Sequence, residues 1–274
     1  MINFNTDYKI GFIGVGNMAS AMIAGMTGVG QYPWENIYLF DISDDKTARF
    51  AERGAMVVGS IKELYESCNC IVLSVKPQTF PDVLAEIKAC KNDKRVLYIS
   101  IGAGISTDSI SAALDGAPVV RALPNTPMLI GKGVSAICRN YGVTDAEFDF
   151  SCSIFESAGS VLKIDEDEMN RIICVTSSSP AYVFMFIKAI CDAATAQGLD
   201  GETALPSVCD MVSGAAELLK ASDKSADELI SMVCSKGGTT ERAVAELKRL
   251  GFPEAIASAM QKCTDRAEEL GQIK

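Results

Sequence analysis

A glycine-rich turn close to the N-terminus constrains the fold more than any other feature of this sequence. The turn, Gly14-Val15-Gly16-Asn17-Met18-Ala19, follows an apolar strand predicted over residues 9–15 and opens a helix predicted over residues 17–26. The first glycine permits a tight turn, the second lets the backbone approach a pyrophosphate, and the alanine keeps the helix close to the strand. The pattern therefore predicts dinucleotide binding at the helix N-terminus, with an ordinary strand–helix turn as the alternative.

The first part of the chain alternates strands with helical patterns. The predicted strands cover residues 9–15, 37–41, 55–58, 70–75, 96–101, 119–123, 133–139 and 160–164. This alternation is typical of a mainly parallel, doubly wound α/β sheet of the Rossmann type. Beyond residue 165 the patterns are helical only, and they cover residues 181–197, 202–221, 226–234, 240–250 and 253–270. We therefore expect a dinucleotide-binding domain of residues 1–165 and a C-terminal all-α domain of residues 166–274 for substrate binding and dimerisation.

Composition excludes several classes of protein. The net charge of −10 argues against a nucleic-acid partner. We find no targeting segment and no apolar run of the roughly 18 residues that a membrane span needs, so we expect a cytoplasmic protein without a membrane partner. The ten cysteines include no CxxC pair, and we interpret them as reduced core residues that bind no metal.

The absence of histidine excludes whole classes of enzyme. No residue of the chain is a histidine. Dehydrogenases that use an imidazole as the acid or base, histidine-based catalytic triads and most catalytic zinc sites are therefore excluded. A proton needed in the reaction has to come from another side chain, from water or from the substrate.

Asp41 and the end of the strand over residues 70–75 indicate how the cofactor binds. A carboxylate at the end of the second strand accepts hydrogen bonds from the adenosine ribose and repels a 2′-phosphate. The four residues after Asp41 include two aspartates and no arginine, so we predict NADH as the favoured cofactor over NADPH. A strand-end turn is the alternative role for Asp41. Val75, Lys76 and Pro77 lie where loops line the cofactor crevice, and we predict contacts there too.

Several motifs along nearly the whole chain resemble those of the pyrroline-5-carboxylate reductases. They are GFIGVGNMA at 11–19, VKPQ at 75–78, ISIGAGIS at 99–106, RALPNTP at 121–127, SPAYVF at 179–184 and GGTTERAV at 237–244. The resemblance implies an oxidoreductase that reduces 1-pyrroline-5-carboxylate to L-proline with NAD(P)H, the last step of proline biosynthesis. It also implies further cofactor contacts at Gly102, Ala103 and Asn125.

The GGTT segment is the predicted substrate site. Gly237 and Gly238 permit a turn whose N–H groups, with those of Thr239 and Thr240, point at an anion such as the ring carboxylate. The alternative is a helix capped by one of the two threonines. The resemblance implies that the Thr240 hydroxyl lies near the ring nitrogen as the catalytic group. It also implies that Ser235 lies near the carboxylate, and that Asp223 stands where relatives carry a glutamate.

Two alternative functions stay open. The first is a reductase of another small imine or of a 3-hydroxy acid. The 3-hydroxy acid dehydrogenases share the opening glycine motif but use a lysine on the first long helix of the second domain, for which Lys188 is the nearest candidate. A non-catalytic paralogue that only binds dinucleotide is suggested by Lys236 and by serines at 177 and 179, where relatives usually have proline and glycines. In each case we expect a homodimer or a higher homo-oligomer, held together by apolar faces of the helical domain.

Overall fold

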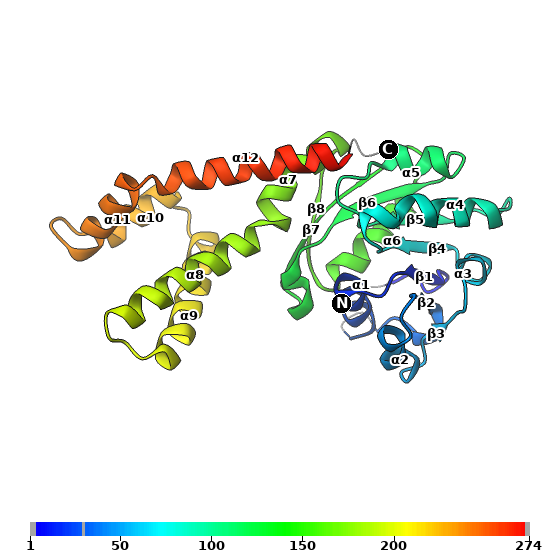
Figure 1. The fold of residues 1–274 in the computed structure, drawn as a ribbon, viewed down its shortest axis with the longest axis horizontal. Helices are drawn as coiled ribbons and strands as arrows, with labels where there is room; N and C mark the ends of the chain where they lie inside the picture. The colour runs from blue at the N-terminus through cyan, green and yellow to red at the C-terminus, as the bar shows by residue number, and fades with distance from the viewer. Residues whose placement is uncertain (1–3, 29–30, 272–274) are drawn as a thin grey trace. The chain divides into compact units, whose positions relative to one another are not determined.

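The computed structural model describes residues 4–28 and 31–271 (Figure 1). Eight strands form one sheet in the order β3-β2-β1-β4-β5-β6-β7-β8. The strands are β1 (Ile10–Ile13), β2 (Ile37–Phe40), β3 (Met56–Val57), β4 (Cys70–Leu73), β5 (Leu97–Ser100), β6 (Val119–Leu123), β7 (Gly133–Arg139) and β8 (Gly159–Lys163). The six strands from β1 to β6 pair in parallel, β7 runs antiparallel to β6, and β8 is parallel to β7. The predicted mainly parallel sheet is confirmed.

Helices cover both faces of this sheet because its strands alternate their side chains between two cores. Phe12 packs with residues of α1 and α6 on one face, and its neighbour Ile13 packs with residues of α3, α4 and α5 on the other. These helices are α1 (Asn17–Gly28), α3 (Ile61–Ser67), α4 (Phe80–Cys90), α5 (Thr107–Ala113) and α6 (Asp145–Glu156). A further helix, α2 (Asp45–Ala51), follows β2. The structure therefore has the doubly wound arrangement expected of a Rossmann-type sheet.

The sequence analysis did not predict α3. Ser60 is its N-cap, and the Ser60 side chain accepts a hydrogen bond from the backbone N–H of Glu63. Ile61, Leu64 and Tyr65 form its buried face. A serine followed three residues later by a glutamate is a helix-start pattern, so the signal was present in a segment too short to show clear periodicity.

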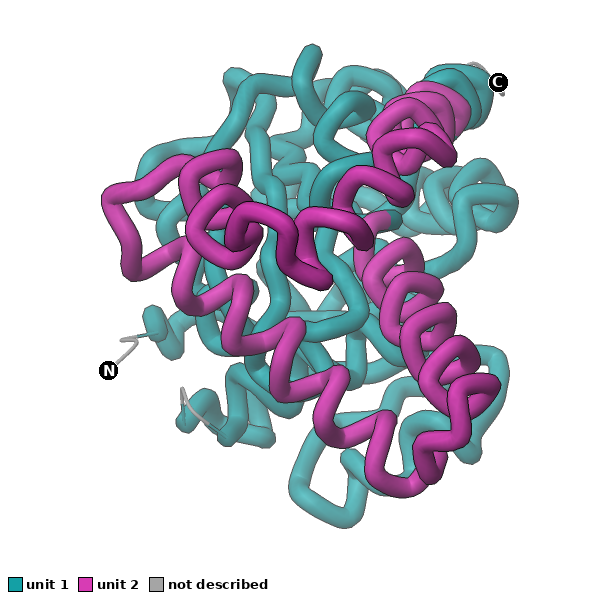
Figure 2. Tube along the Cα trace, turned by 90° about the vertical axis from the view of Figure 1, so that its left-hand side faces the viewer, with its two compact units in different colours: residues 1–178, 263–274 teal, residues 179–262 magenta. Residues whose placement is uncertain are grey.

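The chain divides into two compact units, which differ in extent from the predicted domains (Figure 2). Unit 1 comprises Met1–Ser178 and Cys263–Lys274, and unit 2 comprises Ser179–Lys262. The chain beyond residue 165 continues in unit 1 through η4 (Glu166–Glu168), α7 (Met169–Ile172) and a π-helical turn, η5 (Ile173–Ser177). Met169 and Ile173 pack with Leu123 of β6 and Ala267 near the C-terminus. This apolar cluster holds the segment after residue 165 against the rest of unit 1.

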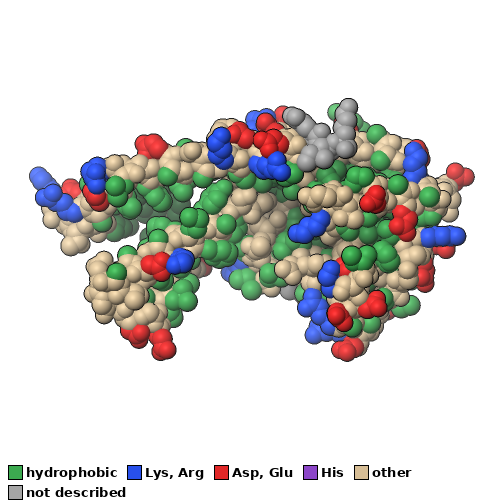
Figure 3. Space-filling model, in the orientation of Figure 1, with side chains coloured by type: hydrophobic (Ala, Val, Ile, Leu, Met, Phe, Trp, Pro, Cys, Tyr) green, Lys and Arg blue, Asp and Glu red, His purple; other side chains and the backbone are tan. Residues whose placement is uncertain are grey.

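Unit 2 is helical, as predicted. Its helices are α8 (Ser179–Ala196), α9 (Gly201–Ala221), α10 (Ala226–Val233), α11 (Thr239–Arg249) and most of α12 (Phe252–Gly271). Among its described residues only Ala204 and Val208 are buried apolar side chains. Many large apolar side chains, including Phe184 and Met185 of α8, are exposed. Figure 3 shows hydrophobic side chains on the surface of these helices.

One helical stretch is more apolar than the sequence analysis allowed. By length and composition alone, the helical stretch 166–196, which contains an 18-residue window with a mean hydropathy of 1.4, would suffice to cross a membrane. Our expectation that no such run exists was therefore too strict. The stretch reaches this value because α8 carries few charges over most of its length. One helix of this kind is by itself weak evidence for a membrane span.

A buried ion pair fastens the segment after β8 to the sheet. Arg121 of β6 is 2% exposed, and its guanidinium donates to Glu166 at 2.8 Å and to the side-chain oxygen of Asn170 at 2.8 Å. The Cys138 thiol donates to the other oxygen of Glu166 at 3.2 Å. Burial, together with the neighbouring Glu166 charge, raises the pKa of Cys138, so the thiol stays protonated and keeps donating.

Replacement of Glu166 by alanine should destabilise unit 1. The substitution leaves the Arg121 charge buried without its counter-charge, and the free energy of unfolding should fall by about 3 kcal/mol, the lower end for buried pairs because Glu166 is one-third exposed. Urea denaturation measures the change. Asp167→Ala, which removes an exposed ion pair with Arg171, is the control and should have little effect. Equal effects of the two substitutions would contradict this prediction.

Candidate active site

A cavity of about 640 Å³ opens at the carboxyl edge of β1, β2 and β4. The strand order reverses at β1, since β2 lies on one side of it and β4 on the other. Such a reversal leaves a crevice in which open α/β sheets bind ligands. The cavity brings together ten of the eleven residues that we predicted to contact the cofactor: Gly14, Gly16, Asn17, Met18, Asp41, Val75, Lys76, Pro77, Gly102 and Ala103.

The structure explains the two glycines of the turn in different ways. Gly14 has a φ of +89°, and a Cβ there would lie 2.9 Å from the carbonyl oxygen of Ser74, so the fold itself requires glycine. A Cβ at Gly16 would meet no protein atom within 4 Å. The protein's own packing therefore does not require Gly16, but a glycine there leaves room for phosphates to approach the N-terminus of α1. The cradle fits a dinucleotide.

Asp41 links the end of β2 to the glycine turn. Its carboxylate accepts hydrogen bonds from the backbone N–H of Val15 at 2.7 Å and of Ser43 at 3.0 Å, and from Lys46 Nζ at 3.0 and 3.2 Å. Partial burial on its own would raise the pKa of Asp41, but these hydrogen bonds outweigh it and hold the pKa below its usual value. The group is therefore a carboxylate at neutral pH.

Asn125 is the predicted cofactor residue that does not line the cavity. It is buried, its amide donates to the carbonyl of Thr176 at 2.9 Å, and its oxygen accepts from the backbone N–H of Val134 at 2.9 Å. Asn125 thus connects η3 (Thr126–Ile130), β7 and the π-helical turn. Thr126 and Leu129 of η3 line the cavity instead.

The sequence analysis missed Lys46 as a cavity residue. It lies in the first turn of α2, lines the cavity and forms the ion pair with Asp41. We considered only the four residues after Asp41 and looked there for arginine. Lys46 is the fifth, and the turn of the chain into α2 brings it back to the carboxylate. A search for any cation in the first helical turn after the strand would have found it.

The predicted substrate turn lies in unit 2, before α11. Gly238 is the N-cap of α11 and no side chain caps this helix, so the alternative in which Thr239 or Thr240 is the cap is wrong. Gly237 has a φ of +74°, its N–H donates to the Glu241 carboxylate at 2.8 Å, and the N–H of Gly238 donates to the carbonyl of Ser235 at 2.9 Å. The prediction that the N–H groups of Gly237 and Gly238 point at an anion is therefore wrong, because both groups have partners within the protein. Neither threonine hydroxyl caps the helix.

The start of α11 has the features of an anion site. The N–H groups of the first helical residues, Thr239, Thr240 and Glu241, cannot bond within the helix. The helix dipole adds partial positive charge at the same point. Ser235 and Lys236 are exposed beside the turn, whereas Thr240 is half-buried.

Two other residues from the sequence analysis lie in unit 2. Asp223 is exposed in the loop between α9 and α10, and in the described part of the chain no hydrogen bond or ion pair joins it to the GGTT turn. Lys188, the candidate for a 3-hydroxy acid dehydrogenase, is exposed on α8 and pairs with Asp192 at 2.6 Å one helical turn later. Its environment is that of an ordinary surface ion pair.

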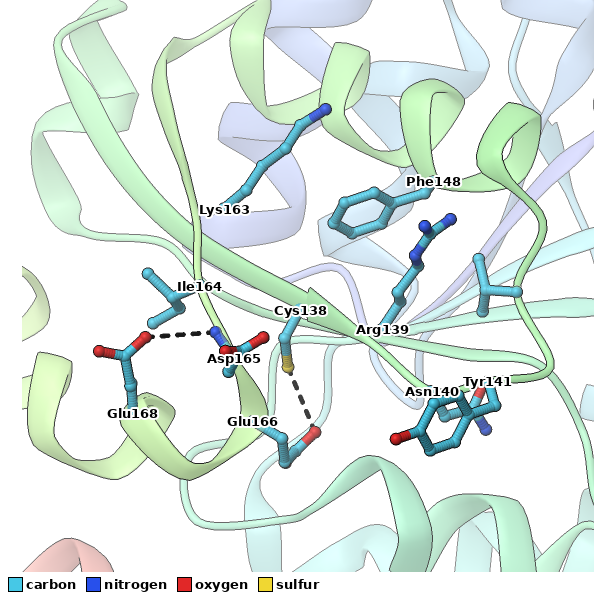
Figure 4. Close-up of a pocket in the computed structure, with 11 residues that line it drawn as sticks. Cys138, Arg139, Asn140, Tyr141, Phe148, Lys163, Ile164, Asp165, Glu166 and Glu168 are labelled. Atoms are coloured by element: carbon cyan, nitrogen blue, oxygen red, sulfur yellow. Dashed lines mark hydrogen bonds between the residues drawn. The ribbon is translucent and has the colours of Figure 1, made fainter.

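A second hollow of about 550 Å³ lies at the opposite edge of the sheet, where β7 and β8 end (Figure 4). Its charged groups already have partners: Arg139 pairs with Asp145, Lys163 with Asp149, and Glu166 with Arg121. Phe148 lies beside both Arg139 and Lys163. Its remaining acidic residues, Asp165 and Glu168, form the capping box of η4.

All ten cysteines are free thiols, and they are distributed between core and surface. Cys68, Cys70, Cys138, Cys152 and Cys174 are buried, whereas Cys209 is exposed. Burial raises the pKa of Cys68 to about 12, so this thiol is not ionised near neutral pH. Within residues 4–28 and 31–271, no group of three or more cysteine, aspartate or glutamate side chains is placed to hold a metal ion.

Comparison with known protein families identifies both parts of the chain. Residues 166–270 match the model of the pyrroline-5-carboxylate reductase dimerisation domain, and residues 9–104 match that of the coenzyme F420-dependent NADP oxidoreductases. The pyrroline-5-carboxylate reductase of Escherichia coli is 36% identical over 266 residues, which cover 96% of this chain and 98% of the relative. That of Pisum sativum is 30% identical, with 96% of each chain covered.

Solved structures agree with these matches. Pyrroline carboxylate reductase from Plasmodium falciparum, a structure with NADP bound, superposes with a TM-score of 0.89 at 28% identity and covers 97% of this chain and 99% of that one. Pyrroline-5-carboxylate reductase from Coxiella burnetii gives a TM-score of 0.88 at 31% identity, with 98% and 100% covered. Because the Escherichia coli, Pisum sativum and Coxiella burnetii relatives match at 30% identity or more over nearly the whole length of both chains, the chain belongs to the pyrroline-5-carboxylate reductase family.

Proposed function

We propose that this protein reduces 1-pyrroline-5-carboxylate to L-proline with NADH or NADPH. The observation that carries the proposal is the GGTT turn, whose glycine cap leaves N–H groups and threonine hydroxyls available to a small anion. The Escherichia coli and Pisum sativum relatives, which match this chain over 96% of its length, are named for this reaction. In biosynthesis the reaction is the last step toward proline.

The proposed chemistry suits a chain without histidine. The substrate is a cyclic imine, and its protonated C=N bond accepts hydride at carbon to become a secondary amine, so no strong general acid is needed. The bound nicotinamide supplies the hydride. The protein's task is to bind the carboxylate at the start of α11, to hydrogen-bond the ring nitrogen through the Thr240 hydroxyl, and to hold the ring in a reactive orientation. Ser235 would help to bind the carboxylate. Asp223 would contribute to substrate binding from the loop between α9 and α10.

NADH is the proposed favoured cofactor. Asp41 ends β2 as a carboxylate, which repels a 2′-phosphate, and Asp44 and Asp45 add negative charge close by in the sequence. The proposed cofactor contacts are the ten cavity residues named above. Asn125 would act indirectly, because its hydrogen bonds hold the segment that places Thr126 at the cavity.

The helical unit is the proposed site of homodimerisation. Unit 2 has almost no buried apolar side chain among its described residues and exposes a series of large ones, an arrangement that calls for an apolar partner surface. The family model that covers residues 166–270 is that of a dimerisation domain. We propose that a second copy covers these faces, and that the protein works in the cytoplasm, where NADH is available and thiols stay reduced.

The first test is a steady-state assay of the purified protein with 1-pyrroline-5-carboxylate. We expect oxidation of both NADH and NADPH, with the higher kcat/KM for NADH because of the Asp41 charge. Absorbance at the reduced nicotinamide band follows the reaction. No turnover with either cofactor would overturn the proposed function, and a higher kcat/KM for NADPH would overturn the cofactor preference alone.

Thr240→Val should lower kcat/KM. The substitution keeps the shape of the side chain but removes the hydroxyl, and loss of a hydrogen bond to a charged group corresponds to about a tenfold to hundredfold decrease. Thr203→Val provides a matched control, since Thr203 is also in the first turn of a unit 2 helix and is exposed. Equal kcat/KM values for Thr240→Val and the wild type would contradict the proposed role of Thr240.

Light scattering tests the proposed dimer. The wild-type protein should have at least twice the mass of one chain, and Met185→Glu should shift it toward one chain mass because a charge cannot enter an apolar interface without a partner. Tyr141→Glu changes an exposed aromatic side chain of unit 1 and should leave the mass unchanged. A wild-type protein of one chain mass would show that the helical faces are not paired.

A further inference from the structure

Lys46 occupies the position from which the cofactor's adenosine ribose would be recognised. It lines the cavity together with Asp41 and Ile42, just after β2. Its side chain is 48% exposed, whereas that of Asp41 is only 5% exposed. The lysine therefore covers the carboxylate, and a ligand that reaches Asp41 meets Lys46 as well.

The Asp41 carboxylate has no free acceptor site while Lys46 is bound to it. Oδ1 accepts from the Ser43 N–H and from Lys46, and Oδ2 accepts from the Val15 N–H and from Lys46. An ionised carboxylate offers about four acceptor sites, and four hydrogen bonds fill them. A ribose hydroxyl has to displace one donor. Val15 and Ser43 donate from the backbone, so Lys46 is the donor that can leave without moving the chain.

Lys46 is also the available cation on the β2 side of the glycine turn. Of the described residues that line the cavity, only Lys46 and Lys76 are positively charged, and Lys76 follows β4 on the other side of β1. Arg49, the next basic residue along α2, donates to Ser20 Oγ at 2.6 Å and lies 4.6 Å from the ring of Phe50. Its guanidinium is therefore held elsewhere.

We propose that Lys46 determines cofactor specificity by changing partners. With NADH bound, the ribose hydroxyls take the acceptor sites on Asp41 that Lys46 gives up. With NADPH bound, the Lys46 ammonium binds the 2′-phosphate and offsets its repulsion by Asp41. Asp41 then favours NADH, and Lys46 still allows NADPH to bind. This inference rests on the proposed use of both cofactors.

The test is titration of NADH and NADPH in the absence of substrate, by calorimetry. Lys46→Met should raise the Kd for NADPH about tenfold or more. It should leave the Kd for NADH unchanged or lower it, because no lysine then has to leave Asp41. Lys46→Arg should restore NADPH binding, because it keeps the charge. Raising the salt concentration should weaken NADPH binding more in the wild type than in Lys46→Met, since the variant lacks the lysine–phosphate contact.

Lys88→Met is the matched control. Lys88 forms a surface ion pair with Asp115 at 2.9 Å, is 53% exposed and lies outside the cavity lining, so both Kd values should stay unchanged. An equal change for both cofactors in Lys46→Met, or no change for NADPH, would overturn the proposal. Because binding is measured without substrate, a protein that binds both cofactors but reduces no 1-pyrroline-5-carboxylate would contradict the proposed reaction and not the role of Lys46.

Discussion

The hydrogen bond from the Val15 N–H to the Asp41 carboxylate is the contact on which the cofactor cavity depends. It joins the glycine turn after β1 to the end of β2, and thus fixes two walls of the cavity with one side chain. Since the acceptor is ionised, the bond belongs to the stronger class of protein hydrogen bonds. The same carboxylate holds Lys46. One aspartate therefore shapes the turn and sets the charge at the β2 end of the cavity.

The two units reach stability by different means. Unit 1 buries apolar side chains on both faces of a sheet and uses the Arg121–Glu166 pair to fasten the segment that follows β8. Unit 2 packs α8 with α9 but leaves most of its large apolar side chains exposed. The hydrophobic effect stabilises only the surface that is removed from water. The fold of unit 1 is thus explained by its own contacts, whereas unit 2 needs a further apolar surface, which the proposed dimer supplies.

The start of α11 shows how backbone geometry can replace side-chain chemistry. A threonine cap would have used a hydroxyl to satisfy the helix N-terminus. With glycine as the cap, the N–H groups of the first turn and the Thr240 hydroxyl remain for a ligand. Anion binding of this kind needs no titrating group, which is consistent with a reductase that contains no histidine.

Local sequence patterns determined the sheet, most helices and the cofactor turn. Strand alternation, helix periodicity and the need for glycine at a positive φ each depend on only a few neighbouring residues. Those patterns were enough to predict all eight strands and to place Gly14, Gly16 and Asp41 in one cavity. Only the tertiary structure decided that Asn125 turns away from the cavity into a buried hydrogen-bond network, and that Lys46 turns toward Asp41. It likewise decided that the segment after residue 165 stays with the sheet. Each of these outcomes depends on contacts between residues distant in the sequence or on the direction of a side chain. Long-range contacts and side-chain directions leave no periodic pattern in the sequence.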